Sequence, residues 1–167
     1  MLEIALEVDE EWDSSRPWLP LVQGAAKAAI AESDFPTLGS DNRSVEISVR
    51  LGSDEEVRSL NAEWRDKDKP TNVLSFPMLE RSDFGQAMFA QPEQLLGDII
   101  LAHGVCTAEA ADKRISLEQH ATHLLVHGTL HLLGYDHLDD ATAADMEARE
   151  IRALERLGIA NPYQVDA

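Results

Sequence analysis

Residues 44–56, Ser-Val-Glu-Ile-Ser-Val-Arg-Leu-Gly-Ser-Asp-Glu-Glu, contain the two patterns that decide the fold class. Apolar side chains alternate with polar ones through the first half of this stretch, at Val45, Ile47, Val49 and Leu51. This alternation predicts a half-buried strand over residues 44–51. Ser53-Asp-Glu-Glu56 then forms a capping box, in which Ser53 caps a helix and Glu56 reaches back to it. We expect that helix to end near Trp64.

Both patterns continue on either side of this stretch. Strands are predicted over residues 2–8, 73–76 and 95–102, and helices over residues 17–33, 107–114, 117–133 and 141–157. Residues 80–94, which contain Gly, Pro and Gln, read as a loop. Strands and helices alternate early and the end is all helical, so the sequence predicts an α+β fold. We expect a single domain over residues 1–167, with a mixed sheet of about four strands packed against about five helices.

The composition of the chain limits its class. A length of 167 residues suits one domain, and 44% hydrophobic residues are typical of globular proteins. The single cysteine, Cys106, excludes an internal disulfide framework and fits a reducing compartment. No run of apolar residues is long enough to span a membrane, and residues 1–7 lack the features of a signal peptide. We therefore expect a cytoplasmic protein. The net charge of −17 argues at first against a nucleic-acid partner.

A histidine pattern is the strongest functional signal, in Leu-Val-His-Gly-Thr-Leu-His-Leu-Leu-Gly-Tyr-Asp-His over residues 125–137. His127 and His131 lie four residues apart on a predicted helix, so their imidazoles share one face. Gly134 can end this helix with a positive φ, and the resulting reversal can bring His137 to the same ion. Three imidazoles leave one tetrahedral position open, as in catalytic zinc sites. An ion held there can lower the pKa of a bound water toward about 7 and polarise a phosphoryl or carbonyl oxygen.

The histidine pattern is also compatible with other interpretations. The helix could simply be rich in histidine, and His123 with His127 forms a second pair of the same spacing, so spacing alone does not choose between them. The turn at Gly134 favours the set 127, 131 and 137, and we expect His123 to pack near the site without binding the ion. We expect His103 and Cys106 to be structural. His120 lies on the same side of the helix.

A zinc peptidase is the first alternative class. His131-x-x-Gly134-x-x-His137 matches the end of the long zinc-protease signature, but Gly128 stands where that signature needs its catalytic Glu. Met146 could imitate the methionine turn, although its position within a predicted helix favours the core. The peptidase reading is therefore less favoured.

A second informative segment runs from Asn61 to Pro77. Arg65 carries a planar guanidinium suited to phosphate, and Lys67 and Lys69 follow closely. Arg65 could instead pair with Glu63, Asp66 or Asp68. Trp64 could stack on a base, but we expect it to fill the core.

Together the two segments resemble the YbeY family of bacterial metal-dependent endoribonucleases, which mature ribosomal RNA. The resemblance covers most of the chain, through Asn-x-x-aromatic-Arg at 61–65, Thr-x-Val-Leu-Ser-Phe-Pro at 71–77, Leu-Gly-Asp-Ile at 96–99 and His-Gly-x-Leu-His-Leu-x-Gly-Tyr-Asp-His at 127–137. It implies one zinc ion on His127, His131 and His137, with Arg65 and His127 as candidate catalytic residues. It also implies cleavage of single-stranded RNA in 16S rRNA 3′-end maturation, a part in ribosome quality control, and as partners the small ribosomal subunit, one of its proteins and an Era-type GTPase.

One position departs from the resemblance. The family usually has Asp after the Thr that corresponds to Thr71, whereas this chain has Asn72. An amide cannot ionise, so an acid–base role is doubtful here, while a role as a turn or cap into the next strand survives.

The nucleophile could be a water activated by the metal or the neighbouring ribose 2′-OH. Asp136 is expected to orient a histidine or cap the turn, and Asp98 is expected to be structural. A non-enzymatic ribosome assembly factor with a structural metal is the second alternative class.

The distribution of charge weakens the objection to RNA. Residues 43–81 hold seven basic and eight acidic side chains, whereas the rest of the chain is strongly acidic. We expect a locally positive groove near the metal on an otherwise repelling surface. A small number of phosphate contacts predicts weak unassisted binding with a shallow dependence on salt.

Overall fold

Four strands form where the sequence predicted them. The computed structural model describes residues 1–40, 43–84 and 93–163. In this part of the chain the strands are β1 (Leu2–Val8), β2 (Ser44–Gly52), β3 (Val73–Pro77) and β4 (Glu93–Ala102). Only β4 departs noticeably from expectation, because it begins two residues earlier. Much of the loop expected over residues 80–94 lies outside the described residues, whose nearest part is a 3₁₀ turn, η2 (Arg81–Asp83).

Five α-helices occur in the described part of the chain. They are α1 (Trp18–Ala31), α2 (Asp54–Arg65), α4 (His103–Lys113), α5 (Leu117–Leu132) and α6 (Asp140–Arg156), and a 3₁₀ turn, η1 (Glu10–Trp12), precedes α1. Helix α4 begins directly at the end of β4, four residues before the expected start. Ser53 caps α2 as predicted, by accepting a hydrogen bond from the Glu56 N–H at 3.2 Å. The Glu56 carboxylate forms a two-pronged pair with Arg50.

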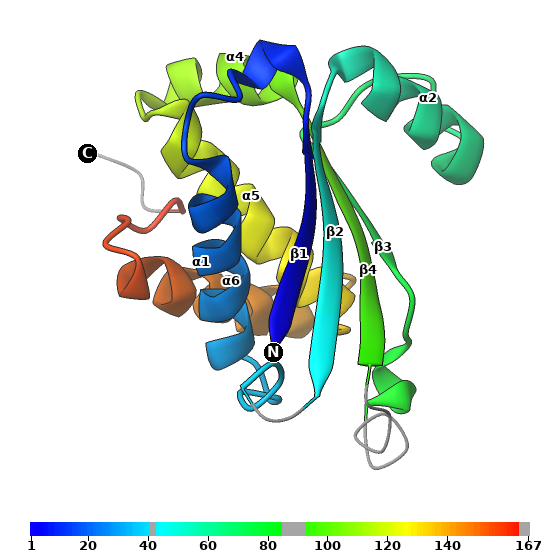
Figure 1. Cartoon of the computed structure of the whole chain (residues 1–167), viewed down its shortest axis with the longest axis vertical. Coiled ribbons are helices and arrows are strands. Elements are labelled where there is room, and N and C mark those ends of the chain that lie inside the picture. Colours follow the sequence, from blue (N-terminus) through cyan, green and yellow to red (C-terminus); the bar gives the residue numbers. More distant parts are fainter. Residues whose placement is uncertain (41–42, 85–92, 164–167) are drawn as a thin grey trace.

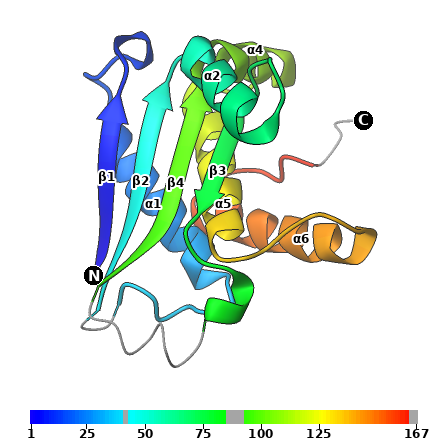
Figure 2. The same ribbon diagram turned by 90° about the vertical axis from the view of Figure 1, so that its right-hand side faces the viewer.

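The sheet has the strand order β1-β2-β4-β3 and is mixed (Figure 2). Strands β1, β2 and β4 run parallel, and β3 runs antiparallel to β4 at one edge. Helices α1 and α5 cover one face, with α6 beyond them, whereas α2 lies over the upper part of the other face (Figures 1 and 2). The predicted class, one α+β domain with a mixed four-stranded sheet and helices packed on it, is confirmed.

The main core lies between the sheet and the helices α1, α5 and α6. A smaller cluster, formed by Val57, Leu74, Ile100 and Ala102, lies on the other face under α2. The second face is therefore only partly covered, because α2 spans just twelve residues.

A bulge in β4 sets which side chains reach the uncovered face. Glu46 pairs with Leu95 but Ile47 pairs with Gly97, so β4 carries one additional residue at this point. Gly97 has φ +147°, and a Cβ there would lie 2.3 Å from the Phe76 carbonyl oxygen. Only glycine fits this close approach. The bulge places Leu96 in the core and Asp98 on the exposed face.

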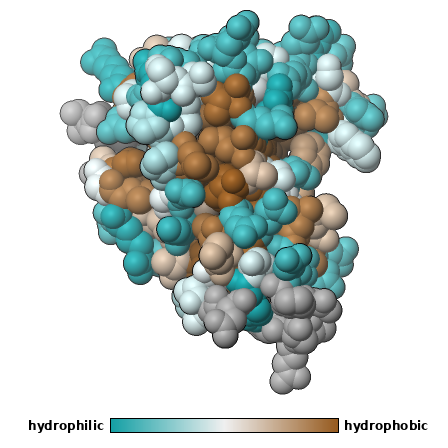
Figure 3. Space-filling model, viewed as in Figure 1, coloured by the Kyte–Doolittle hydropathy of each residue, from teal (hydrophilic) through white to brown (hydrophobic). Residues whose placement is uncertain are grey.

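β1 is the other edge of the sheet, and its apolar side chains are half-buried. Figure 3 shows hydrophobic atoms gathered in the middle of this view, over β1 and the adjoining side of α1. Among the described residues, no helix combines the length and the apolar character needed to cross a lipid bilayer.

Candidate metal centre

Helix α5 presents two of the predicted ligands on one face. Ser116 caps it, in a capping box with Gln119. His127 and His131 follow one turn apart, with ring centroids 4.5 Å apart and their Nε2 atoms separated by 2.9 Å. Both side chains are half-buried. The four-residue spacing therefore aims two imidazole nitrogens at one point.

The turn after α5 brings the third histidine back. Gly134 has φ +94°, its N–H donates to the His131 carbonyl, and the N–H of Tyr135 donates to the Leu130 carbonyl. These two bonds form a Schellman motif, which closes the helix and reverses the chain. The ring of His137 then lies 5.7 Å from that of His127 and 5.1 Å from that of His131, centroid to centroid. One nitrogen of each ring lies within 4.8 Å of the other two.

Hydrogen bonds to the other ring nitrogens orient the first two histidines. The Nδ1 of His127 lies 2.6 Å from Oε1 of Glu150, and the Nδ1 of His131 lies 3.0 Å from the carbonyl oxygen of Tyr135. A ring held through Nδ1–H keeps the lone pair of Nε2 for a metal. The Asp136 carboxylate accepts a hydrogen bond from the His137 N–H at 2.7 Å, so it stabilises the turn as expected. This donor set fits a divalent ion such as Zn²⁺.

Glu150, on α6, was not identified from the sequence, yet it is fully buried behind the cluster. Burial raises the pKa of this carboxyl, but hydrogen bonds from His123, His127 and Tyr163 outweigh that effect and hold its pKa at about 2. The Tyr163 hydroxyl donates to Oε2 at 2.7 Å. Glu150 is therefore an anion that can hold the His127 ring. The sequence did contain a signal for it: Glu150 follows the apolar Met146 by four residues, so it lies on the same, buried side of α6.

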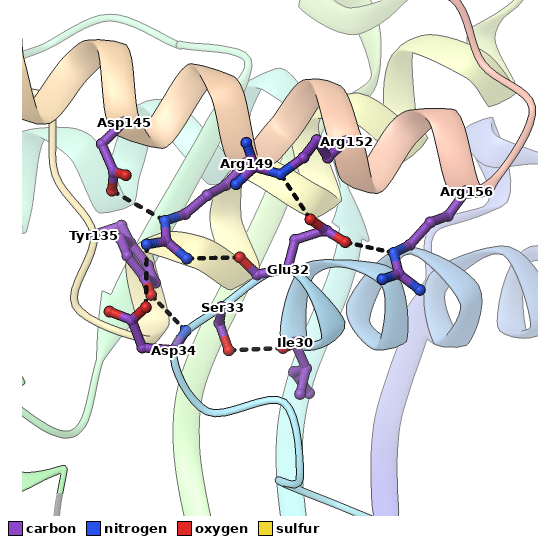
Figure 4. Close-up of polar contacts among 9 residues, drawn as sticks. All are labelled: Ile30, Glu32, Ser33, Asp34, Tyr135, Asp145, Arg149, Arg152 and Arg156. Atoms are coloured by element: carbon purple, nitrogen blue, oxygen red, sulfur yellow. Dashed lines mark hydrogen bonds and ion pairs between the residues drawn. The ribbon is translucent and has the colours of Figure 1, made fainter.

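A polar network holds α6 and the turn in position (Figure 4). Glu32, at the end of α1, pairs with Arg152 at 2.8 Å and Arg156 at 2.6 Å, both on α6. Arg149 donates to the Glu32 carbonyl at 2.7 Å and lies over the ring of Tyr135, 4.6 Å from its centroid. The contacts therefore fix both supports of the site, Glu150 through α6 and the Tyr135 carbonyl through the turn.

His131 stays neutral at physiological pH. Burial, together with the neighbouring His127 and His137, lowers the pKa of His131 to about 4. A neutral imidazole is the form that binds a metal ion. The side chain is therefore ready to act as a ligand without first releasing a proton.

Arg65 lies in the same cleft as the histidines. The cleft has a volume of about 840 Å³, and its lining includes His127, His131 and His137 together with Arg65, Lys67 and Lys69. Asn61, which is 2% exposed, holds the loop that carries the two lysines. Its side-chain amide donates to the Lys69 carbonyl at 2.8 Å, and its backbone carbonyl accepts from the Lys67 N–H at 3.1 Å. Of the basic residues expected near the metal, Arg65, Lys67 and Lys69 are the ones that line the cleft.

Arg65 makes none of the ion pairs considered as alternatives, within the ranges that the structure describes. Its Nη2 donates to the Ser75 carbonyl at 3.0 Å, and its guanidinium lies 5.7 Å from the centre of the Phe76 ring. Asp68, one of the candidate partners, pairs instead with Arg58. A guanidinium that keeps unused donors beside a cleft can bind an anion.

The remaining histidines and the cysteine lie outside the cluster. His120 is 1% exposed and its Nε2 lies 2.8 Å from Glu109 Oε1, while His123 contacts Glu150 and Tyr163. His103 contacts Glu11 and the ring of Trp12. Cys106 is fully buried, and burial raises its thiol pKa to about 12. These positions agree with the supporting roles expected for them.

Asn72 acts as the predicted cap into β3. Its side-chain oxygen accepts a hydrogen bond from the Val73 N–H at 2.7 Å, and its amide donates to Glu109 at 3.0 Å. The residue therefore has a structural role that does not require an ionisable group.

Packing at Gly128 argues further against a peptidase. A Cβ at this position would lie 3.1 Å from Ile99 and 3.2 Å from Ser75 Oγ. The residue thus faces the sheet, where the catalytic Glu of the zinc-protease signature would have no room. Met146 is 1% exposed and belongs to the core, as expected.

The core position expected for Trp64 is wrong. Its side chain is 67% exposed, near the end of α2. Its position seven residues after the buried Val57 gives it nearly the same side of the helix. The side chain instead lines a hollow between the end of α2 and the sheet.

A three-histidine cluster that shares a cleft with basic side chains is typical of metal-dependent hydrolases that act on phosphate esters. Comparison with known proteins specifies this class. A family model described as Endoribonuclease YbeY matches residues 15–158. The chain therefore belongs to the YbeY family of endoribonucleases.

Individual relatives agree with this assignment. A protein from Erythrobacter litoralis is 52% identical over 165 residues, covering 97% of this chain and 96% of its own length. One from Novosphingobium aromaticivorans is 49% identical over 165 residues, covering 98% and 96%. Both are named Endoribonuclease YbeY. A solution structure of a Thermotoga maritima protein has the same fold, with a TM-score of 0.55 and 22% identity over 99% of this chain and 97% of that one.

Proposed function

We propose that this chain is a zinc-dependent endoribonuclease that cleaves single-stranded RNA during 3′-end maturation of 16S ribosomal RNA. Its family membership supports RNA cleavage in ribosomal RNA processing. The observation that carries the metal-dependent part is that the three histidines and Arg65 line one cleft. We take residues 1–167 as one catalytic domain acting in the cytoplasm, where ribosomal subunits mature.

In this proposal His127, His131 and His137 hold the ion. A zinc ion bound there would polarise a phosphoryl oxygen and lower the pKa of an oxygen nucleophile. The protein's own contribution begins with orientation: Glu150 and the Tyr135 carbonyl hold two of the rings through Nδ1. Fixed rings define where the scissile phosphate can approach.

Arg65 would bind the same phosphate from the opposite side of the cleft. Its planar fork can donate two hydrogen bonds to phosphoryl oxygens, whose negative charge grows in the transition state. Lys67 and Lys69 add positive charge for the flanking phosphates. Because Glu80 and Asp136 also line the cleft, we expect unassisted binding to be weak. A small-subunit ribosomal protein and an Era-type GTPase are the proposed partners that deliver the RNA, and ribosome quality control is the proposed wider role.

Metal analysis combined with an RNA cleavage assay tests this function. The wild type should contain about one zinc ion per chain, and His131→Ala should lose it. Arg65→Ala should keep the ion but cleave a 16S 3′ precursor roughly 100- to 1,000-fold more slowly. Arg16→Ala is the matched control, because Arg16 is a surface arginine that pairs with Glu118 and does not line the cleft.

The same experiment separates the alternatives. Wild-type cleavage rates in Arg65→Ala would refute the role of Arg65, and full zinc retention in His131→Ala would refute the metal site. If a variant lacking all three histidines still restored ribosomal RNA ends in cells, the chain would act as an assembly factor. Hydrolysis of casein would indicate a peptidase.

A further inference from the structure

The uncovered face of the sheet carries a second hollow, separate from the metal cleft. It has a volume of about 770 Å³ and lies between the sheet and the end of α2. Figure 2 looks onto this face, with α2 over the upper ends of β4 and β3. The strand register places Ala5, Ser48, Asp98 and Phe76 in one row across all four strands. We call this hollow the sheet groove.

The sheet groove is apolar with a few polar groups. Leu60, Phe76 and Ile100 supply apolar surface, and Ser48 and Asp98 supply hydrogen-bonding groups. Trp64 forms one wall and exposes 67% of its surface. A large aromatic ring exposed beside a hollow of this size is a platform for a flat ligand.

Arg65 connects the sheet groove to the metal cleft. It bonds to the carbonyl of Ser75, which lines the cleft, and its guanidinium lies over Phe76, which lines the groove. Ser75 and Phe76 are consecutive residues of the edge strand β3, so their side chains point to opposite faces. A chain that passes Arg65 at this edge can therefore enter both hollows.

The charges of the two hollows differ. In the sheet groove Glu7 and Asp98 are acidic, and Arg50 is already paired with Glu7 and Glu56. This arrangement disfavours a phosphate. Across the sheet edge, Lys67 and Lys69 line the metal cleft with Arg65, and neither lysine makes an ion pair within the described residues. Phosphates are therefore expected on the cleft side, and an uncharged, planar, partly apolar group in the sheet groove.

We propose that the sheet groove binds one nucleobase of the RNA, stacked on Trp64, beside the nucleotide whose phosphate Arg65 contacts. The inference rests on the proposed function and adds a binding site for a flanking base. Asp98 gives the site a preference, because a carboxylate accepts hydrogen bonds from the exocyclic amino groups of cytosine, adenine and guanine, which uracil lacks. The bulge at Gly97 is what brings this carboxylate to the exposed face.

Tryptophan fluorescence gives a direct readout of this site. Trp12 and Trp18 are 1% and 2% exposed, so Trp64 is the tryptophan that a bound base can reach. The full-length protein is titrated with a 2′-O-methyl oligonucleotide carrying the 16S 3′ sequence, and with copies that lack one base at each position in turn. We expect wild-type fluorescence to be quenched, and a single abasic position to weaken binding and remove the quench.

Substitutions complete the cycle. Trp64→Ala should weaken binding roughly 5- to 150-fold, and the critical abasic position should cause no further loss in this variant. Trp64→Phe should lose less, because it keeps a ring. Asp98→Ala should remove the preference for amino-bearing bases. Leu19→Ala is the control, since Leu19 is 42% exposed on α1, behind the sheet.

Two outcomes would overturn the inference. If Trp64→Ala binds as tightly as the wild type and the quench persists, no base stacks there, and the groove serves another occupant such as a protein. If the fold-loss of affinity in Trp64→Ala multiplies with the fold-loss at every abasic position, the two changes are independent. Trp64 would then act without contacting a particular base. Failure of the proposed function looks different, because the wild type would then neither bind nor cleave the RNA.

Discussion

The two halves of helix α5 carry the same residue type at similar spacing but have different surroundings. In the first half, His120 and His123 turn Nε2 toward Glu109, Glu150 and Tyr163, and their Nδ1 atoms are buried without a hydrogen-bond partner among the described residues. In the second half, His127 and His131 are held through Nδ1 and turn Nε2 toward the cleft. The two pairs are spaced by three and by four residues, and either spacing places both histidines of a pair on one side of the helix. The partner of each ring, rather than the spacing, decides which pair faces a ligand.

This difference shows why helical spacing of histidines is by itself a weak signal of a metal site. An imidazole becomes a good ligand when its other nitrogen is fixed by an acceptor. Acceptors lie behind the second half because α6 and the Gly134 turn return to it, and α4 lies behind the first half with Glu109. The comparison can be tested by changing each half in the same way.

The largest effect is expected from matched ligand substitutions. His127→Gln should lose about one metal ion per chain, because glutamine does not replace an imidazole at a zinc site. His123→Gln should retain the ion, since His123 lies behind the cluster. Metal content is measured after equilibration with zinc and gel filtration. Equal loss in both variants would mean that the two halves of α5 do not differ as described.

An intermediate effect is expected from the carboxylates behind each half. Glu150→Gln should weaken zinc binding roughly 10- to 100-fold, because the His127 ring loses its anionic acceptor. Glu109→Gln changes the corresponding partner of His120 and should leave zinc affinity unchanged. Competition with a chromophoric chelator measures both affinities. Thermal unfolding of each variant, recorded alongside, separates loss of affinity from loss of folding.

The smallest effect is expected on the pH dependence of stability, through the ion pairs of Glu32 with α6. Hydrogen bonds from Arg152 and Arg156 lower the pKa of Glu32 below its usual 4.5. A lowered carboxyl pKa means that the pair stabilises the fold above about pH 4.5 and that this contribution is lost as the pH falls through the lowered value. Glu32→Gln should remove about 1 kcal/mol of stability at pH 7 and less below pH 4. Urea unfolding at both pH values checks this, and an equal loss at both would show that ionisation of Glu32 is irrelevant. Weakening this pair loosens α6, the helix that holds Glu150 behind His127.

Local features were predictable from the sequence because they depend on near neighbours. The Ser53 cap, the alternating strands and the glycine turn at 134 each need only a few consecutive residues. The same applies to the convergence of the three histidines, which follows from helix periodicity and one reversal. Their role as ligands remains a prediction.

Features that depend on distant segments were not predictable in the same way. Glu150 reaches His127 only because α6 crosses behind α5, and a carboxylate on a helix gives no sign of that crossing. Trp64 has the spacing of a buried residue, but helical periodicity does not indicate how closely the end of α2 packs on the sheet. The strand order also depends on long-range pairing, since β2 lies next to β4 and not β3.

The turn at Gly134 has a consequence for the coupling of metal binding to folding. Two donors lie on a rigid helix, and the third arrives through a short reversal, so a bound ion would close a small chelate ring across the helix end. Ion binding would then stabilise the folded turn, and the melting temperature of the protein would rise with the free metal concentration.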